Sequence, residues 1–292
     1  MFKRALISTD LSDGLYRLVD SVPALAQSGL EQVVFTHCVA LEGIIPKTDN
    51  DKIEWAKSRL SVLRPNISDS LEVKGEVVSS VKPHETILEV AKKHRSDVIV
   101  MGANIHTLMD EQFFGSTSRS LAEHTDIPIM VLRPQLVSTY TSEELNLRCR
   151  YLFRYLMLTY DGSSSAQYLL QRVKDYAQNR PANSLEKLLL VWVVEEGGRR
   201  DYKDADYELE KAKTELEKVK EDLSDLNLEI EVEVRQGEII PQIFESALMH
   251  DISAIAVSSN RKNKILEWSS PSISNKILRR SWHPIIYFSP RH

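Results

Sequence analysis

The sequence predicts an α/β protein made of two tandem domains, each a doubly wound, Rossmann-like parallel sheet with helices on both faces. The first observation is an internal repeat: residues 83–134 align without a gap with residues 239–290, at an offset of 156 positions. The second is the alternation of short Val/Ile/Leu-rich runs with amphipathic stretches, in the same order in each copy. Uninterrupted apolar runs are typical of strands buried on both faces, and strands that alternate with helices form parallel sheets with right-handed crossovers.

The repeat also sets the domain boundaries. His94 aligns with His250 at the offset of 156, and Asp10 aligns with Asp161 at an offset of 151. A period this long indicates two domains rather than a solenoid. We assign residues 1–137 to the first domain, 151–292 to the second, and 138–150 to a polar linker with a helical pattern.

Each copy is expected to contain five strands and four main helices. The expected strands are residues 4–9, 33–39, 71–77, 98–101 and 129–132 in the first copy, and 155–159, 188–194, 228–234, 254–257 and 285–288 in the second. The expected helices are residues 12–26, 52–63, 83–94 and 116–124, and then 163–179, 204–223, 239–250 and 272–278.

Composition excludes several classes of protein. Of the 292 residues 42% are apolar and 27% charged, the formal net charge is −5, and the sequence contains no basic block. Such a chain is a poor candidate for binding nucleic acid or an anionic membrane. Apolar runs such as residues 188–194 are far shorter than the roughly 20 residues that a membrane span needs. The first apolar stretch of the sequence ends at Asp10 and is too short for the apolar region of a signal peptide. Cys38 and Cys149 match no metal or redox spacing, which favours a reducing, cytoplasmic compartment.

Four segments are expected to meet in one crevice of the first copy, because ligands of such sheets bind beyond the carboxyl ends of the strands. They are the turn at Asp10, the strand end at 38–40, the loop 102–115, and the helix start at Ser116 and Thr117. A glycine followed by Ser or Thr at a helix start is a sound anion site, since backbone N–H groups and the helix N-terminus both favour negative charge. The same residues also suit a helix N-cap preceded by a hinge, and both interpretations stay open.

The sequence resembles a tandem-domain universal stress protein over nearly the whole chain. Nucleotide-binding members of that family carry Gly-x-x-Gly, nine residues, and then Gly-Ser/Thr, together with an Asp at the end of the first strand. The first copy has Gly102, Ile105 in place of the second glycine, and, nine residues later, Gly115-Ser116; Asp10 closes its first strand. The resemblance implies that the fifth strands of the two copies, 129–132 and 285–288, pair antiparallel and form a pseudo-dimer.

The resemblance also implies roles for these residues in binding ATP or AMP. Asp10 would contact the adenosine part, and the backbone near Val39 would meet the adenine edge. Ribose and phosphates would be held by Gly102, the backbone at Ile105, and Gly115, Ser116 and Thr117. Ile105 departs from the pattern: if this position needs a positive φ, a β-branched residue costs roughly 1–2 kcal/mol or more, which weakens binding about tenfold.

The second copy departs further. The residues aligned with the motif are Ser258, Arg261, Pro271 and Ser272, so all three glycines are absent. Pro271 has no N–H to offer an anion, and Asp161 could survive only as part of a helix cap. Long cations such as Arg261 and its neighbour Lys262 could supply charge, but the pattern favours a closed or structural cleft over a phosphate site.

Other features point to no further chemistry. His37, His106 and His124 have no metal-ligand spacing, so no metal is expected, and no nucleophile constellation is evident. Cys38 fits a core residue better than a reactive thiol. The charged segment 202–223 fits a solvated helix with one face on its sheet, with a partner-binding helix as the alternative.

These observations favour a cytoplasmic stress-response binding protein whose first domain binds an adenine nucleotide, ATP or AMP, and which is not a dedicated enzyme. The alternative is a universal stress protein without nucleotide that acts through partner contacts. A third class, an ATP-hydrolysing or adenylyl-transferring enzyme, would have only His106 and Arg119 near its site. A homo-oligomer beyond the intramolecular pseudo-dimer is also open.

Overall fold

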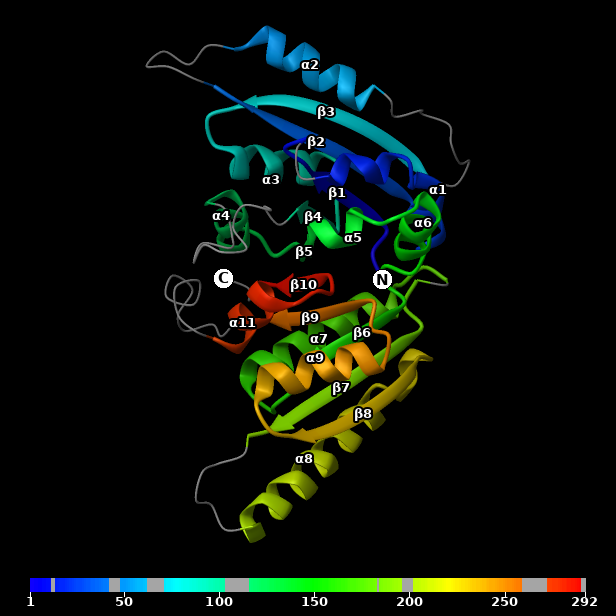
Figure 1. The fold of residues 1–292 in the computed structure, drawn as a ribbon, viewed down its shortest axis with the longest axis vertical. Helices are drawn as coiled ribbons and strands as arrows, with labels where there is room; N and C mark the ends of the chain where they lie inside the picture. The colour runs from blue at the N-terminus through cyan, green and yellow to red at the C-terminus, as the bar shows by residue number, and fades with distance from the viewer. Residues whose placement is uncertain are drawn as a thin grey trace. The chain divides into compact units, whose positions relative to one another are not determined.

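The structure is a computed structural model that describes residues 1–11, 14–41, 48–61, 71–102, 116–182, 184–195, 202–258 and 272–289. The chain divides into two compact units (Figure 1). One unit comprises residues 2–151, and the other comprises residues 152–292 together with Met1. No helix among the described residues is both long enough and apolar enough to cross a membrane.

The first unit contains a five-stranded sheet in the order β3-β2-β1-β4-β5, in which every neighbouring pair is parallel. Its strands are β1 (Arg4–Ser8), β2 (Gln32–Ala40), β3 (Glu72–Ser80), β4 (Val98–Gly102) and β5 (Ile129–Leu132). Its helices are η1 (Leu15–Val19), α1 (Val22–Gln27), α2 (Asn50–Leu60), α3 (Pro83–Lys93), α4 (Ser116–His124), α5 (Pro134–Val137) and α6 (Ser142–Arg150).

The second unit repeats this topology, with a parallel sheet in the order β8-β7-β6-β9-β10. Its strands are β6 (Tyr155–Thr159), β7 (Lys187–Val194), β8 (Glu229–Gln236), β9 (Ala254–Ser258) and β10 (Ile285–Phe288). Its helices are α7 (Ser164–Gln178), α8 (Tyr202–Asp222), η3 (Ser224–Leu226), α9 (Ile239–Met249) and α11 (Ile273–Arg280). The identical strand order confirms the predicted fold class of two tandem doubly wound domains.

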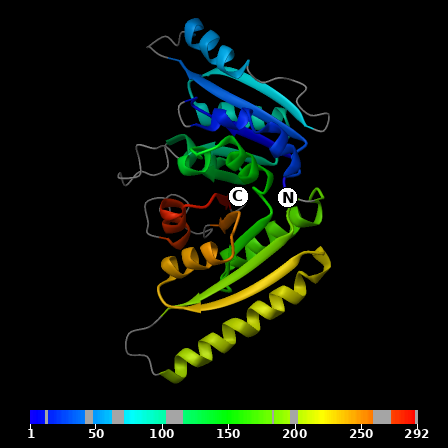
Figure 2. The ribbon, with the colours of Figure 1, turned by 45° about the vertical axis from the view of Figure 1, so that its right-hand side comes forward.

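Strand burial agrees with helices on both faces of each sheet. Every residue of β5, β9 and β10 is buried, which explains their uninterrupted apolar sequences. The long helix α8 runs along β7 and β8 (Figure 2), and its stripe Ala212, Leu216 and Val219 is buried, as is Leu223 directly after the helix. This segment is therefore a helix with one face on its sheet, as the charge pattern predicted.

The first predicted helix of the sequence, residues 12–26, is wrong as a single element. The described part of this stretch forms η1 and then α1, with Ser21 as the N-cap of α1 and Pro23 in its first turn. Proline lacks an N–H and clashes with the preceding turn, so it is tolerated at a helix start but not in the interior. The chain therefore ends one short helix and begins another before Pro23.

Helix α6 lies within the segment assigned from the sequence to the linker. Thr141 caps it by accepting a hydrogen bond from the Glu144 N–H at 3.2 Å, and its Leu145 and Cys149 are buried. The helix packs against α1, and the first compact unit extends to Tyr151.

Candidate functional site

The crevice predicted for the first unit would lie at the switch point of its sheet, where β1 and β4 are adjacent. The connections leave these two strands in opposite directions, so their carboxyl ends leave room for a ligand. Ser8 of β1 is in register with Met101 of β4, which brings Asp10 and Gly102 to the ends of neighbouring strands. Asp10 is exposed, and Gly102 is half-buried.

Hydrogen bonds hold the end of β1 in place. The Thr9 N–H donates to the Thr36 carbonyl at 3.0 Å, which continues the parallel ladder beyond the strand. The Thr9 hydroxyl oxygen accepts from the Leu11 N–H at 2.9 Å. The chain therefore turns directly after Asp10, which leaves its carboxylate at the exposed edge.

Strand β2 brings Val39 to the same edge. Its side chain is buried, and in the sheet it is in register with Ser79 of β3. The neighbouring Cys38 is half-buried, and burial raises the pKa of its thiol to about 11. At neutral pH this thiol stays protonated, so Cys38 lacks the thiolate that a nucleophile needs.

Ser116 and Thr117 are the first two residues of α4, with Ser116 exposed and Thr117 half-buried. Ile105 and Gly115 lie outside the described residues. The described members of the predicted site thus lie where β1, β2 and β4 end and where α4 begins, at one edge of the sheet. The roles assigned to them stay predictions.

Arg133 is a residue that the sequence analysis did not single out. It follows Leu132, which is in register with Gly102, so it stands at the carboxyl end of the strand next to β4. Arg133 is buried, and this burial lowers the pKa of its guanidinium to about 10, which still leaves it charged at neutral pH. The aligned residue of the second copy is Ser289, so this cation has no counterpart at the aligned position.

The second unit contains a cavity of about 210 Å³ at the corresponding position, between the ends of β6 and β9. The sequence favours a closed or structural cleft over a phosphate site here, and this stays a prediction because the aligned residues Arg261 and Pro271 lie outside the described residues. Without the glycines of the motif, backbone N–H groups can no longer come close to an anion. Among the described residues, however, no larger side chain fills the cavity. The described lining residues are Thr159, Tyr160, Asp161, Ser163, Ser165, Ala166, Leu169, Val191, Val193, Ile239, Ile243, Ser258, Ser272, Ile273 and Ser274.

The turn after β6 is built by local sequence. Gly162 has a φ of 71°, and a Cβ there would lie 3.3 Å from the Trp192 ring, so glycine suits this position. The Asp161 Oδ1 accepts from the Ser163 N–H at 3.0 Å, and the Ser163 hydroxyl oxygen accepts from the Ala166 N–H at 3.2 Å. Ser163 is therefore the N-cap of α7, Asp161 holds the turn that leads into it, and Asp161 also lines the cavity.

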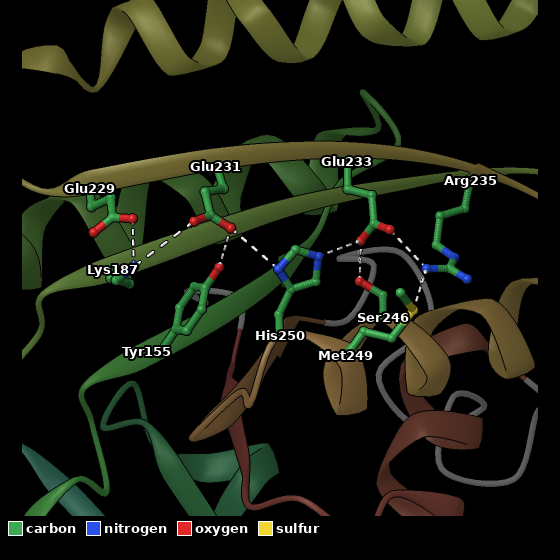
Figure 3. Close-up of polar contacts among 9 residues, drawn as sticks. All are labelled: Tyr155, Lys187, Glu229, Glu231, Glu233, Arg235, Ser246, Met249 and His250. Atoms are coloured by element: carbon green, nitrogen blue, oxygen red, sulfur yellow. Dashed lines mark hydrogen bonds and ion pairs between the residues drawn. The ribbon is translucent and has the colours of Figure 1, made fainter.

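A second polar cluster lies on the sheet of the second unit (Figure 3). Glu229, Glu231, Glu233 and Arg235 alternate along β8 and so share one face of this edge strand. The remaining side chains of the cluster come from β6, β7 and the end of α9: Tyr155, Lys187, Ser246, Met249 and His250.

His250 bridges two carboxylates in this cluster. Its Nδ1 lies 3.3 Å from Glu231 Oε2, and its Nε2 lies 3.3 Å from Glu233 Oε2. The Tyr155 hydroxyl donates to Glu231 at 2.6 Å, and Lys187 lies 4.0 Å from the same carboxylate. The hydrogen bond from Tyr155 is the main reason why the pKa of Glu231 lies below its usual value. Burial and Glu231 together raise the pKa of Tyr155.

The first unit contains a counterpart of this contact. His94, aligned with His250, hydrogen-bonds to Glu76 of β3, and Lys93 reaches the same carboxylate at 2.7 Å. Burial alone would raise the pKa of Glu76, but the bonds from Lys93 and His94 lower it. The repeated histidine and the alternating glutamates of β8 were visible in the sequence, but only the strand register brings them together. Among the described residues, no group of three His, Cys, Asp or Glu side chains is arranged to hold a metal ion.

Comparison with known proteins identifies the class. Two tandem doubly wound parallel sheets of the same strand order define a pair of repeated α/β domains. The sequence profile of the Universal stress protein family matches residues 1–133 and again 153–288. The chain therefore belongs to the universal stress protein family. None of the curated proteins matches the sequence.

Solved structures agree with this fold. A universal stress protein from Archaeoglobus fulgidus DSM 4304 aligns with a TM-score of 0.59 and 17% identity over 97% of this chain and 95% of that chain. A functionally unknown protein from Pseudomonas aeruginosa PAO1 aligns with a TM-score of 0.59 and 10% identity over 99% of this chain and 93% of that chain. At these identities the likeness shows the fold alone.

Proposed function

We propose that this universal stress protein is a cytoplasmic binding protein of the stress response whose first domain takes an adenine nucleotide, ATP or AMP, without dedicated catalytic machinery. One observation carries the proposal: Asp10 and Gly102 stand at the ends of the two adjacent strands that form the switch point. Ligands of doubly wound sheets bind at that point.

The surrounding chemistry supports an anionic ligand. Helix α4 begins at Ser116, so the N–H groups of its first turn and the hydroxyls of Ser116 and Thr117 lie at its N-terminus, where a helix favours an anion. Arg133 adds a buried positive charge at the same edge of the sheet. Asp10 supplies an exposed carboxylate that can accept hydrogen bonds from a hydroxyl or amino group.

The protonated thiol of Cys38 supports a binding role for this edge rather than nucleophilic catalysis. His37 is engaged through its Nδ1 with the Thr9 carbonyl at 2.9 Å. These two residues at the end of β2 therefore bind and orient chain segments rather than supply an activated nucleophile.

Isothermal titration of the full chain with ATP and with AMP tests the proposal. We expect one nucleotide per chain in the wild type and loss of this binding in Gly115→Val, because the valine blocks backbone approach to the phosphates. Ser272→Ala, the matched change at the start of α11 in the second unit, should leave it unaltered. Binding that survives Gly115→Val, or a wild-type chain that binds neither nucleotide, would contradict the proposal.

A further inference from the structure

Strand β3 is the outermost strand of the first unit's sheet (Figure 1), and its outer edge pairs with no strand among the described residues. Gly75, near the middle of the strand, is exposed, and because glycine has no side chain this is exposure of the backbone. A groove of about 650 Å³ lies between α2 and β3, and Gly75 and Val77 help to line it. An open edge of nine residues is a template on which another strand can pair.

The ladder with β2 fixes which backbone groups of β3 face this open edge. The Glu72 N–H donates to the Glu31 carbonyl at 2.9 Å, and the Ser80 carbonyl accepts from the Leu41 N–H at 3.0 Å. In a parallel pair, alternate residues direct both their N–H and their C=O groups to the same neighbouring strand. The even-numbered residues of β3 therefore bond to β2, and the odd-numbered residues 73–79 direct their N–H and C=O groups outward.

The sequence of β3 is complementary to itself in an antiparallel pair. With the two-fold axis at Gly75, each Val73 lies opposite Val77 of the second copy, and all three of these residues have outward-facing backbone groups. Between them, Lys74 lies opposite Glu76 of the second copy, once on each side of the axis. Pairs of opposite charge across an antiparallel ladder are stabilising. Glycine at the axis allows the two backbones to approach closely.

Other registers lose this match. An axis at Lys74 brings two ammonium groups together, and an axis at Glu76 brings two carboxylates together. Like charges directly opposite each other are destabilising. An axis at Val77 sets Glu76 against the apolar Val78, and an axis at Val73 shortens the overlap to three residues of β3. Hydrogen-bonding groups and charges therefore agree best with the axis at Gly75.

Both charged side chains can make the contact. Lys74 lies 2.6 Å from Glu72, but both side chains are exposed, so water screens this pair and it contributes little. Lys93 and His94 both bond to the Oε1 of Glu76, at 2.7 and 2.5 Å. The Oε2 of Glu76 can therefore accept a hydrogen bond from Lys74 of the second copy.

We propose that the outer edge of β3 is an interface with a second copy of this chain, in which the two β3 strands pair antiparallel about Gly75. The occupant is a second copy because the strand complements itself in backbone hydrogen bonds and in charge at the same register. A two-fold contact of this kind closes on itself and gives a dimer rather than a filament. The interface contains none of the residues of the candidate nucleotide site and stands whether or not that site takes a nucleotide.

Disulfide trapping reads the register directly. Gly75 faces itself across the axis with a Cα separation of about 5.5 Å, which a disulfide can span. The full chain with Gly75→Cys should therefore form a covalent dimer under mild oxidation, seen on a non-reducing gel. Glu72→Cys is the matched control, because it is an exposed position of the same strand whose copy would lie about 20 Å away. It should cross-link at least tenfold more slowly, against the same background from the two native cysteines.

Sedimentation velocity of the full chain tests the interface without a cross-link. The wild type should approach twice the mass of one chain as its concentration rises to about 0.1 mM. Lys74→Glu sets like charges opposite each other on both sides of the axis and should weaken dimerisation at least tenfold. Lys211→Glu on α8 is the matched control, because Lys211 also forms an exposed pair, 3.7 Å from Glu208, and it should dimerise like the wild type.

A second variant keeps the test decisive if Lys74→Glu fails to fold. Gly75→Pro removes an N–H that faces away from β2, so the ladder within the sheet stays intact, and proline is tolerated on an edge strand in that position. It removes the two central hydrogen bonds of the proposed dimer and should also weaken dimerisation at least tenfold.

Three results would overturn the proposal. A wild-type chain that stays monomeric at about 0.1 mM would show that the charges of β3 keep this edge unpaired. A dimer that survives both Lys74→Glu and Gly75→Pro would form through another surface. Cross-linking of Glu72→Cys as fast as that of Gly75→Cys would show that the strands do not pair in the proposed register.

Discussion

Replacing Tyr155 with Phe removes one hydroxyl group and tests the polar cluster of the second unit. This hydroxyl donates to the ionised Glu231 at 2.6 Å. A hydrogen bond to a charged group contributes about 1.5–3 kcal/mol when it is buried. The Glu231 side chain is 37% exposed, so water screens part of this interaction and we expect a loss of about 1 kcal/mol in the free energy of unfolding.

The sign of the pH dependence follows from Glu231. The hydrogen bond from Tyr155 lowers its pKa in the folded state from the ordinary value of 4.5. Its contribution is therefore complete above that ordinary value and is lost as the pH falls through the lower folded-state pKa. The difference between wild type and Tyr155→Phe should be largest at neutral pH and should shrink under acid conditions.

Urea denaturation followed by far-UV circular dichroism, at about pH 7 and about pH 3.5, measures this difference. Tyr160→Phe is the matched control, because among the described residues the Tyr160 hydroxyl makes no hydrogen bond, and the change in the free energy of unfolding should stay below about 0.5 kcal/mol. The reasoning is refuted if Tyr155→Phe behaves like Tyr160→Phe at neutral pH, or if its destabilisation grows on acidification.

Three further predictions follow from the same structure and sequence. Ile105→Gly should strengthen AMP binding about tenfold in a titration, because it removes a β-branched residue from the one broken position of the motif; unchanged or weaker binding would show that Ile105 is not the obstacle. Cys38, whose pKa is about 11 rather than 9.0, should react with iodoacetamide about a hundredfold more slowly at neutral pH than a cysteine of ordinary pKa. Mass spectrometry follows the reaction, and alkylation at the ordinary rate would contradict the burial of Cys38. Leu216→Ala should destabilise the second unit by about 2–5 kcal/mol in urea denaturation, because Leu216 lies on the fully buried face of α8, whereas Tyr207→Ala, on the exposed face of this helix, should cost little; equal effects would mean that α8 does not pack on its sheet.

Much of the fold could be predicted because it repeats. Alignment of the two copies and the apolar runs located all ten strands named above within a few residues. The sequence analysis expected a single helix over residues 12–26 because the apolar residues there follow a helical period. Pro23 indicated a break, because proline fits the first turn of a helix and not its interior.

The candidate sites were less predictable because they depend on space and register. Asp10 and Gly102 lie at the edge where the strand order places them, and Ile105 and Gly115 stay predictions. The cavity of the second unit could not be predicted because motif loss shows which contacts are absent, but not whether side chains fill the space. The contact of His250 with Glu231 and Glu233 was missed because it depends on packing between α9 and β8.

The central claim is that the first domain takes one adenine nucleotide at the switch point of its sheet. Amide chemical shifts of the labelled full chain, titrated with AMP, test it most directly. The account predicts that AMP shifts the amides of Gly102, Ser116 and Thr117 and leaves those of Asp161 and Ser274 unmoved. AMP that leaves the first set unmoved, or that shifts the second set as strongly as the first, would contradict it.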